Sequence, residues 1–244
     1  MKFERTEVFN FEGALRGMRN PKNSWDKSDS YWEQTTKFED GYRVFEYRIG
    51  QKDLALAQSL IKAGSEHRKF MRQIFVSVDI TAPLYWWKEF DTYKVGTVAN
   101  STSTMHKLAS TPITKDCFEM YDFSELDKLP LIELENVRCT MRTYWEWVLI
   151  PMLEKLRQKY NETKDIRYWK ELIRLLPESW LQKRTVTMDY ENLLAICSKG
   201  QRRFHKLTEW SKAFIDWVRT LPYAQELIFI DEVQKQETEN ENSN

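Results

Sequence analysis

The sequence predicts an α/β protein of the α+β type, and three observations carry that prediction. Apolar and polar residues alternate in two early segments, as half-buried strands require. Between these segments, and over most of the second half, apolar residues recur every three or four positions, as in amphipathic helices. One stretch of the second half, 181–188, is rich in β-branched residues that favour a strand. The class therefore combines early strands with a mainly helical second half.

In chain order, the first predicted strand covers 45–49, with Phe45, Tyr47 and Ile49 on one face. A helix over 54–61 follows. Gly64 is placed to end this helix, because glycine adopts the left-handed conformation common at helix ends. The second predicted strand runs from Ile74 to Ile80 with every second residue apolar. The first third of the chain therefore predicts strand, helix and strand.

A short helix is predicted over 84–90 after Ala82-Pro83, and the polar run 96–104 is predicted as a loop long enough to line a site. Trp86 and Trp87 could stack on a flat ligand ring, although tryptophans more often belong to a core. The second half is predicted to be helical, with a kink at Pro151. Its predicted helices span 137–160, 165–176, 190–199 and 203–220.

The 244 residues suit one globular domain, predicted over 1–230, because 41% hydrophobic content can form a substantial core. Residues 231–244 are predicted as a disordered polar tail, since they have almost no apolar side chains. The 37 basic and 37 acidic residues cancel, so no global charge favours nucleic acid. The three widely spaced cysteines predict neither disulfides nor a zinc site.

No stretch reaches the ~18 apolar residues that a membrane-spanning helix needs, and the first residues are charged rather than apolar. We therefore expect no membrane partner and a reducing, cytoplasmic location. No glycine-rich dinucleotide motif, phosphate-binding loop, zinc-protease motif or hydrolase elbow occurs in the sequence. These absences argue against the enzyme classes that use those motifs.

An ordered set of short motifs resembles the flavin-dependent thymidylate synthase family over roughly residues 64–228. That family has the run Leu-Pro, Thr-Met-Asn-Ala-Arg, Leu-Leu-His-Phe, His-Ala-Gln-Trp-Glu and Pro-x-Ala-x-Glu, and an Ala-Pro element upstream. The matching residues of this chain keep the same order and nearly the same spacing. They are Ala82-Pro83, Leu175-Leu176-Pro177, Thr187-Met188-Asp189, Leu193-Leu194, Glu209-Trp210 and Pro222-Tyr223-Ala224-Gln225-Glu226.

The resemblance implies a central, largely antiparallel sheet with a helical half packed on it. It also implies FAD as cofactor, NADPH and methylenetetrahydrofolate as co-substrates, and a deoxyuridine monophosphate-like nucleotide as substrate. In this family the product is thymidylate, and the active site is built at subunit contacts of a homotetramer. The first 60 residues match no part of the family pattern.

Several arginines that bind phosphates in the family are replaced here. The Arg-His-Arg positions fall on Thr92, Tyr93 and Lys94, and the Ser-x-Arg-Tyr positions on Thr102, Thr104 and Met105. The resemblance makes Thr102 the candidate catalytic residue, Tyr93 and Lys94 candidate cofactor ligands, and Thr104 a candidate substrate ligand. The surviving hydroxyls could still bind phosphate through hydrogen bonds.

The second half shows the same loss, because the Asn and Arg of Thr-Met-Asn-Ala-Arg fall on Asp189 and Glu191. Asp189 is a candidate cofactor ligand by position, although negative charge near a pyrophosphate is unfavourable. The remaining candidates are His67 for the cofactor and Lys88, Arg174 and Arg202 for the substrate.

Three functional hypotheses follow from this pattern. The first is a divergent flavin-dependent thymidylate synthase whose phosphate contacts have been rebuilt from other residues. The second is an inactive or repurposed homologue that binds another nucleotide, and the loss of arginines at several separate places favours it. The third is a structural or interaction protein, which leaves the ordered motifs unexplained.

Overall fold

The computed structural model describes residues 1–39, 42–93, 95–103, 107–120, 122–135, 137–198 and 207–232. These residues form two compact units. The first unit contains residues 1–2, 80–92 and 100–184, and the second contains residues 3–79, 93–99 and those from 185 onward. The single domain over 1–230 stays a prediction, and the predicted tail beyond residue 232 lies outside the described residues.

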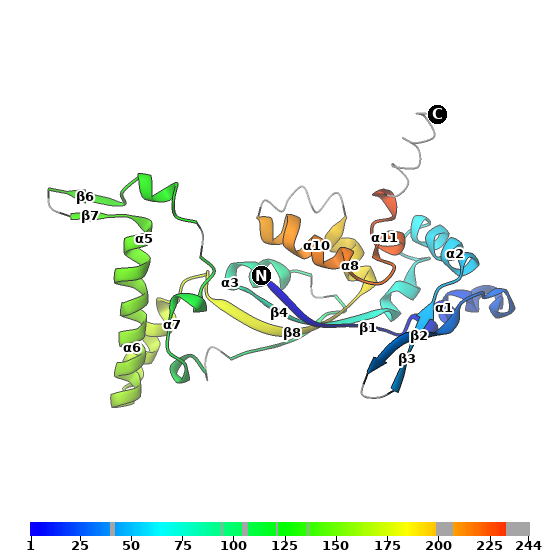
Figure 1. The fold of residues 1–244 in the computed structure, drawn as a ribbon, viewed down its shortest axis with the longest axis horizontal. Coiled ribbons are helices and arrows are strands. Elements are labelled where there is room, and N and C mark those ends of the chain that lie inside the picture. Colours follow the sequence, from blue (N-terminus) through cyan, green and yellow to red (C-terminus); the bar gives the residue numbers. More distant parts are fainter. Residues whose placement is uncertain are drawn as a thin grey trace. The chain divides into compact units, whose positions relative to one another are not determined.

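The main sheet has four strands in the order β1-β4-β8-β5 (Figure 1). Their bounds are Lys2–Phe9 for β1, Phe75–Pro83 for β4, Val98–Ser101 for β5 and Leu181–Asp189 for β8. Strands β4 and β8 run antiparallel, since the amide of Tyr190 donates to the carbonyl of Ile74 and the hydroxyl of Thr185 donates to Asp79. The predicted combination of antiparallel sheet and helices is confirmed, as are the strands predicted over 74–80 and 181–188.

Strand β4 is buried because its alternating residues are large and apolar. Val76, Val78 and Ile80 have no exposed surface, and β4 lies between β1 and β8 in the sheet. Residues 98–101 belong to β5, although the polar run 96–104 was predicted as loop throughout. Of these four residues only Val98 favours a strand, so local propensity is weak and pairing with β8 supplies the hydrogen bonds.

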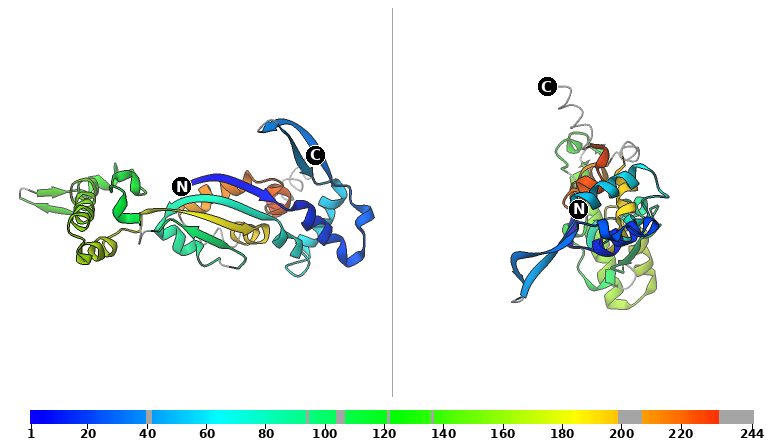
Figure 2. Two further views of the ribbon diagram at one scale, coloured as in Figure 1. Left: turned by 90° about the horizontal axis from the view of Figure 1, so that it is seen from below. Right: turned by 90° about the vertical axis from the view of Figure 1, so that its right-hand side faces the viewer.

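In the described part of the second unit, α-helices accompany a separate hairpin of strands β2 and β3, which is visible in Figure 2 as a two-stranded ribbon. The hairpin strands span Tyr31–Glu39 and Tyr42–Arg48. The helices are α1 (Phe11–Arg19), α2 (Gln51–Lys62), α8 (Tyr190–Cys197), α10 (Ile215–Arg219) and α11 (Ala224–Leu227). A π-helix over Glu209–Phe214 precedes α10, and 3-10 helices span Asn20–Lys22, Trp25–Lys27 and Lys69–Gln73.

Several predicted elements of this unit are confirmed. The helix predicted over 54–61 lies inside α2, and Gly64 follows it with φ 108°. The strand predicted over 45–49 coincides with most of β3. The helix predicted over 190–199 is α8, which ends at Cys197. The start of the helix predicted over 203–220 lies outside the described residues.

The first unit contains α3 (Leu84–Phe90), α5 (Met141–Thr143), a π-helix (Tyr144–Leu149), α6 (Ile150–Thr163) and α7 (Ile166–Arg174). A short hairpin pairs β6 (Ile132–Leu134) with β7 (Val137–Cys139). Three further 3-10 helices span Leu108–Ser110, Lys115–Cys117 and Leu126–Lys128. One hydrophobic core cluster of this unit consists of Leu108, Ile113, Phe118, Leu149, Ile150, Leu153 and Leu172.

The helix predicted over 137–160 is wrong at its start. Residues 137–139 form strand β7, and Thr140 begins the helical segment with a capping box to Thr143. A three-residue strand is too short for periodicity to separate it from a helical turn, so pairing with β6 decides its structure. Pro151 lies where the π-helix Tyr144–Leu149 continues directly into α6, so its missing amide falls inside one helical run and not at a free helix start.

Candidate functional site

The loop before β5 approaches the start of α8 very closely. Gly96 has φ 77°, and a Cβ atom there would lie 2.8 Å from Oδ2 of Asp189. The amide group of Asn192 also donates to the carbonyl of Val95. Only glycine adopts this backbone conformation without strain and leaves this space free. Two segments that the sequence assigned to one site, about ninety residues apart, are therefore in contact.

Asp189 is the N-cap of α8. Its Oδ1 accepts from the backbone amide of Asn192 at 2.9 Å, and Oδ1 of Asn192 accepts from the backbone amide of Asp189 at 3.1 Å. This reciprocal capping box explains why the aspartate is tolerated where the family has asparagine, since both are good N-caps. Burial raises the pKa of the Asp189 carboxyl. A phosphate bound here would lie beside the carboxylate of Asp189, which already caps α8.

The other carboxylate of this motif, Glu191, has a cation of its own. Nε of Arg68 lies 2.9 and 3.0 Å from the two oxygens of Glu191. No local sequence pattern indicates this ion pair, because Arg68 and Glu191 lie 123 residues apart in the chain. The ion pair neutralises the charge that Glu191 would otherwise present to a ligand.

Thr102, the candidate catalytic residue, is attached to β8 in the first unit. Its amide and its hydroxyl both donate to the carbonyl of Lys183, at 2.8 and 3.2 Å, and its own carbonyl accepts from Gln182. Among the described residues, neither an imidazole nor a carboxylate is hydrogen-bonded to this hydroxyl. The hydroxyl oxygen can therefore accept a hydrogen bond from a ligand, while a general base for it is not in place.

The candidate substrate cations of the first unit are both paired and exposed. Nζ of Lys88 lies 2.5 Å from Glu178, and Nη1 of Arg174 lies 2.7 Å from Glu171. Lys88 and Arg174 thus pair with different carboxylates. Three other candidates, Lys94, Thr104 and Arg202, lie outside the described residues.

Arg184 is a cation of the first unit that sequence reasoning missed. Its guanidinium lies 4.2 Å from the ring centroid of Trp87, donates to Gln182 and pairs with Asp91 at 2.9 Å. Its position in the β-branched stretch 181–188 indicates neither Trp87 nor Asp91 as a partner. Trp86 and Trp87 are 0% and 1% exposed, so both belong to the core and neither is available to stack on a ligand.

In the second unit, the candidate cofactor ligands His67 and Tyr93 have different surroundings. The ring of Tyr93 packs against that of Trp210 at a centroid distance of 5.7 Å. His67 follows α2 and lines a groove of about 450 Å³. The groove has an apolar part with Met18, Leu56, Leu60 and Phe70, and a polar part with Asn20, Lys22, Ser24, Glu66, Lys69 and Gln73. A flat ring with a polar substituent suits such a lining.

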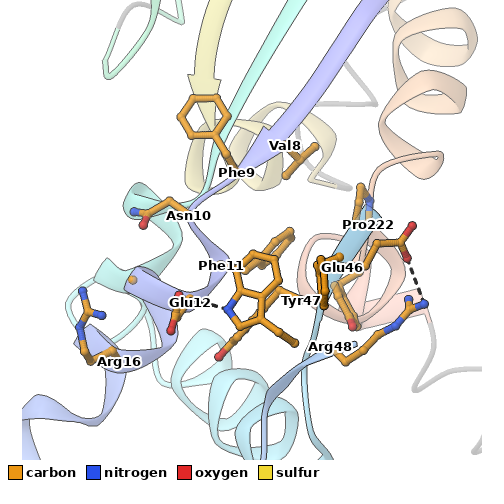
Figure 3. Close-up of a pocket in the computed structure, with 14 residues that line it drawn as sticks. Val8, Phe9, Asn10, Phe11, Glu12, Arg16, Glu46, Tyr47, Arg48 and Pro222 are labelled. Atoms are coloured by element: carbon orange, nitrogen blue, oxygen red, sulfur yellow. Dashed lines mark hydrogen bonds and ion pairs between the residues drawn. The ribbon is translucent and has the colours of Figure 1, made fainter. Parts of the chain in front are cut away.

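A second hollow of the same unit, of about 570 Å³, lies where β1 meets α1 (Figure 3). Its walls are aromatic: Phe9, Phe11, Trp32, Phe45, Tyr47 and Tyr223. The indole of Trp32 donates to Glu12, and Arg48 pairs with Glu46. It contains none of the candidate site residues. Apart from Pro222 and Tyr223, which belong to a motif match, its lining comes from the first 60 residues, which match no family motif.

Among the described residues, no group of three or more histidine, cysteine, aspartate and glutamate side chains could hold a metal ion. Within the same residues, no helix has the length and apolar character needed to cross a membrane. Cys117, Cys139 and Cys197 are free thiols.

Comparison with solved structures identifies the class of fold. A crystal structure of flavin-dependent thymidylate synthase ThyX from Helicobacter pylori, complexed with FAD and dUMP, superposes with a TM-score of 0.60 at 17% identity, over 95% of this chain and 99% of that one. A second structure of ThyX from the same organism, also with FAD and dUMP, gives a TM-score of 0.58 at 16% identity, over 95% and 98% of the two chains.

The chain therefore has the flavin-dependent thymidylate synthase fold. No family model matches the sequence, and no curated protein matches it significantly. The likeness thus lies in the fold, at low sequence identity.

Proposed function

We propose that this protein is a divergent flavin-dependent thymidylate synthase. It binds FAD and a dUMP-like nucleotide and methylates the nucleotide reductively, with methylenetetrahydrofolate as carbon donor and NADPH as reductant. The observation that carries the proposal is a fold match over 95% of the chain to an enzyme crystallised with FAD and dUMP. The ordered motifs between residues 64 and 228 support it independently of the fold.

The residues of the second unit fit a flavin nucleotide in two respects. The groove beside His67 combines an apolar wall that includes Phe70 with polar groups at its edge. The contact of Gly96 with Asp189 brings the loop to a helix start, as a ligand cradle requires. FAD, when bound, supplies hydride chemistry that no side chain provides. The chain's part is to bind and orient the ring and the nucleotide.

The candidate roles follow from these positions. His67 contacts the flavin ring from the groove, and Tyr93, Lys94 and Asp189 are further cofactor contacts. Lys88, Thr104, Arg174 and Arg202 are the proposed nucleotide ligands. To bind the nucleotide, Lys88 and Arg174 must break their exposed ion pairs. Such pairs contribute only ~0–1 kcal/mol, so little stability is lost when the nucleotide replaces the carboxylate partner. Thr102 offers its hydroxyl to the nucleotide.

The test is a visible absorption spectrum of the purified protein with and without added FAD, followed by gel filtration. A flavin spectrum that elutes with a tetramer is the expected result, and assays of dUMP methylation follow. A colourless protein that FAD does not stabilise, but that another nucleotide does, would replace the proposal with a repurposed homologue.

Asp189→Asn is expected to strengthen FAD binding about fivefold, because a unit charge ~4 Å away contributes ~1 kcal/mol even in water. Asparagine keeps the N-cap acceptor, so the unfolding midpoint should stay within a few degrees. Asp165→Asn makes the same change at the N-cap of α7 and serves as the matched control. Flavin fluorescence titration measures both. Equal affinities in the two variants would remove Asp189 from the proposed cofactor contacts.

A further inference from the structure

Three lysines surround one hollow of about 490 Å³ in the second unit. Lys22 ends one 3-10 helix, Lys27 ends the next, and Lys52 lies in the first turn of α2. The remaining lining residues are Arg19, Ser24 and Leu56, so no carboxylate is among the described residues that line the hollow. Three positive charges on one concave surface produce a local potential that attracts anions.

These lysines differ from the cations that the sequence proposed. Lys88 and Arg174 each have a carboxylate partner. Within the described part of the chain, the ammonium groups of Lys22, Lys27 and Lys52 have no ion pair. The carboxylate of Asp29, close to Lys52 in the fold, accepts from the amides of Lys52 and Asp53 at 2.9 and 3.1 Å and caps α2. The lysine charges are therefore available to a ligand.

The hollow has a rigid floor built around Arg19, which is 5% exposed. Its Nε pairs with Asp53 of α2 at 2.5 Å, while Nη1 and Nη2 donate to the carbonyls of Ser24 and Lys27. This guanidinium thus joins the carbonyls of Ser24 and Lys27 to Asp53 of α2, the residue after Lys52. Nε, Nη1 and Nη2 of Arg19 each donate to a protein acceptor, so Arg19 supports the site and is not proposed to bind the ligand.

The hollow continues into the groove of His67, because Lys22, Ser24 and Leu56 line both. One end of this continuous surface is cationic and the other contains Phe70 and His67. A ligand with phosphates at one end and a flat ring at the other matches that division. Such a ligand is a nucleotide, and the matching phosphate class is a monophosphate or pyrophosphate.

We propose that Lys22, Lys27 and Lys52 form a phosphate-binding site. They supply the positive charge that arginines of the family motifs provide and that this chain lacks at those positions. The assignment of the ring end rests on the proposed function, whereas anion binding at the lysines does not. The phosphate could belong to a flavin nucleotide or to a free anion, and titrations with FAD and with inorganic pyrophosphate distinguish these two sources.

The experiment compares wild type with Lys22→Gln/Lys27→Gln/Lys52→Gln, using FAD, riboflavin and inorganic pyrophosphate in calorimetric titrations at low salt. Riboflavin carries the ring without phosphate. In the wild type, FAD should bind at least about tenfold more tightly than riboflavin, since hydrogen bonds to charged groups contribute ~1.5–3 kcal/mol. The triple variant should bind FAD and riboflavin equally and should no longer bind pyrophosphate. In the wild type, higher salt should weaken both the preference for FAD over riboflavin and the binding of pyrophosphate.

The control variant Lys62→Gln/Lys115→Gln/Lys170→Gln removes the same charge from exposed positions elsewhere and should keep the wild-type affinities. Unchanged FAD and pyrophosphate binding in the first variant overturns the lysine site and leaves the flavin proposal standing. Lysine-dependent pyrophosphate binding without any flavin binding supports the site and rejects the flavin proposal. An equal loss in both triple variants overturns the site, because it would reflect net charge alone.

Discussion

Asp53→Ala is expected to destabilise the protein by about 3–5 kcal/mol, the range found when one partner of a buried ion pair is removed. Asp53 is 0% exposed and binds Arg19 through Oδ1, while the hydroxyls of Ser28 and Ser30 donate to Oδ2 at 2.5 and 2.6 Å. Removal of the carboxylate leaves a buried guanidinium without its counter-charge. The loss is a large part of the 5–15 kcal/mol typical of a folded domain.

Urea denaturation measures this effect, and Asp26→Ala, an exposed aspartate of the neighbouring 3-10 helix, is the control, with a change within about 0.5 kcal/mol. The double variant Arg19→Met/Asp53→Leu should recover part of the stability, because apolar residues can replace a buried pair. If Asp53→Ala and Asp26→Ala unfold at the same urea concentration, the ion pair between Arg19 and Asp53 does not stabilise the fold.

The same carboxylate should contribute to acid sensitivity. Burial alone would raise the pKa of Asp53, but hydrogen bonds from Ser28, Ser30 and Arg19 outweigh it, and the net pKa is lowered. A lowered pKa means that the contribution is complete above the unfolded value of ~3.9 and is lost as the pH falls through the folded value. Wild type should therefore lose more stability than Asp53→Asn between pH 5 and the acid limit.

Trp87→Ala is the second large effect, about 3–5 kcal/mol, as expected when a fully buried tryptophan is truncated. The ring contacts Trp86 and Phe90 at centroid distances of 4.8 and 5.5 Å, and Nε1 donates to the carbonyl of Gln182 at 3.0 Å. The guanidinium of Arg184 lies over its face. The truncation therefore removes packing, a buried hydrogen bond and a cation–π contact together.

Two variants separate these contributions in thermal and urea unfolding. Trp87→Phe keeps an aromatic ring but leaves the Gln182 carbonyl without its donor, so about 1–3 kcal/mol should be lost. Trp147→Ala truncates a tryptophan of the same unit that is 77% exposed and should cost little. If Trp87→Ala costs no more than Trp147→Ala, then Trp87 is not a core residue.

The predictability of the fold varied with the length and regularity of each element. The strand predicted over 74–80 and the helix predicted over 54–61 were found because long alternating or helical patterns leave little choice of period. The hairpin strand at 137–139 and strand β5 were missed because each is short and is decided by its partner strand. Local propensity contains no information about a partner.

The candidate site was less predictable than the fold. Sequence order indicated that the loop near residue 96 and the segment from Asp189 belong to one site, and the structure brings Gly96 and Asp189 into contact. The sequence did not indicate that Arg68 pairs with Glu191, or that Arg184 lies between Asp91 and Trp87. Such pairs join residues about a hundred positions apart, and their charges become specific only when the fold places them.

The sequence by itself determined the class of fold, because periodicity records which face of each element is buried. It also determined that the family arginines are replaced, because that is a matter of residue identity. Only the tertiary structure decided which remaining cations are available. Lys88 and Arg174 are paired with carboxylates, whereas Lys22, Lys27 and Lys52 surround one hollow on a scaffold fixed by Arg19 and Asp53. The physical reason is that a charge acts over a few ångströms of space, and sequence separation does not measure that distance.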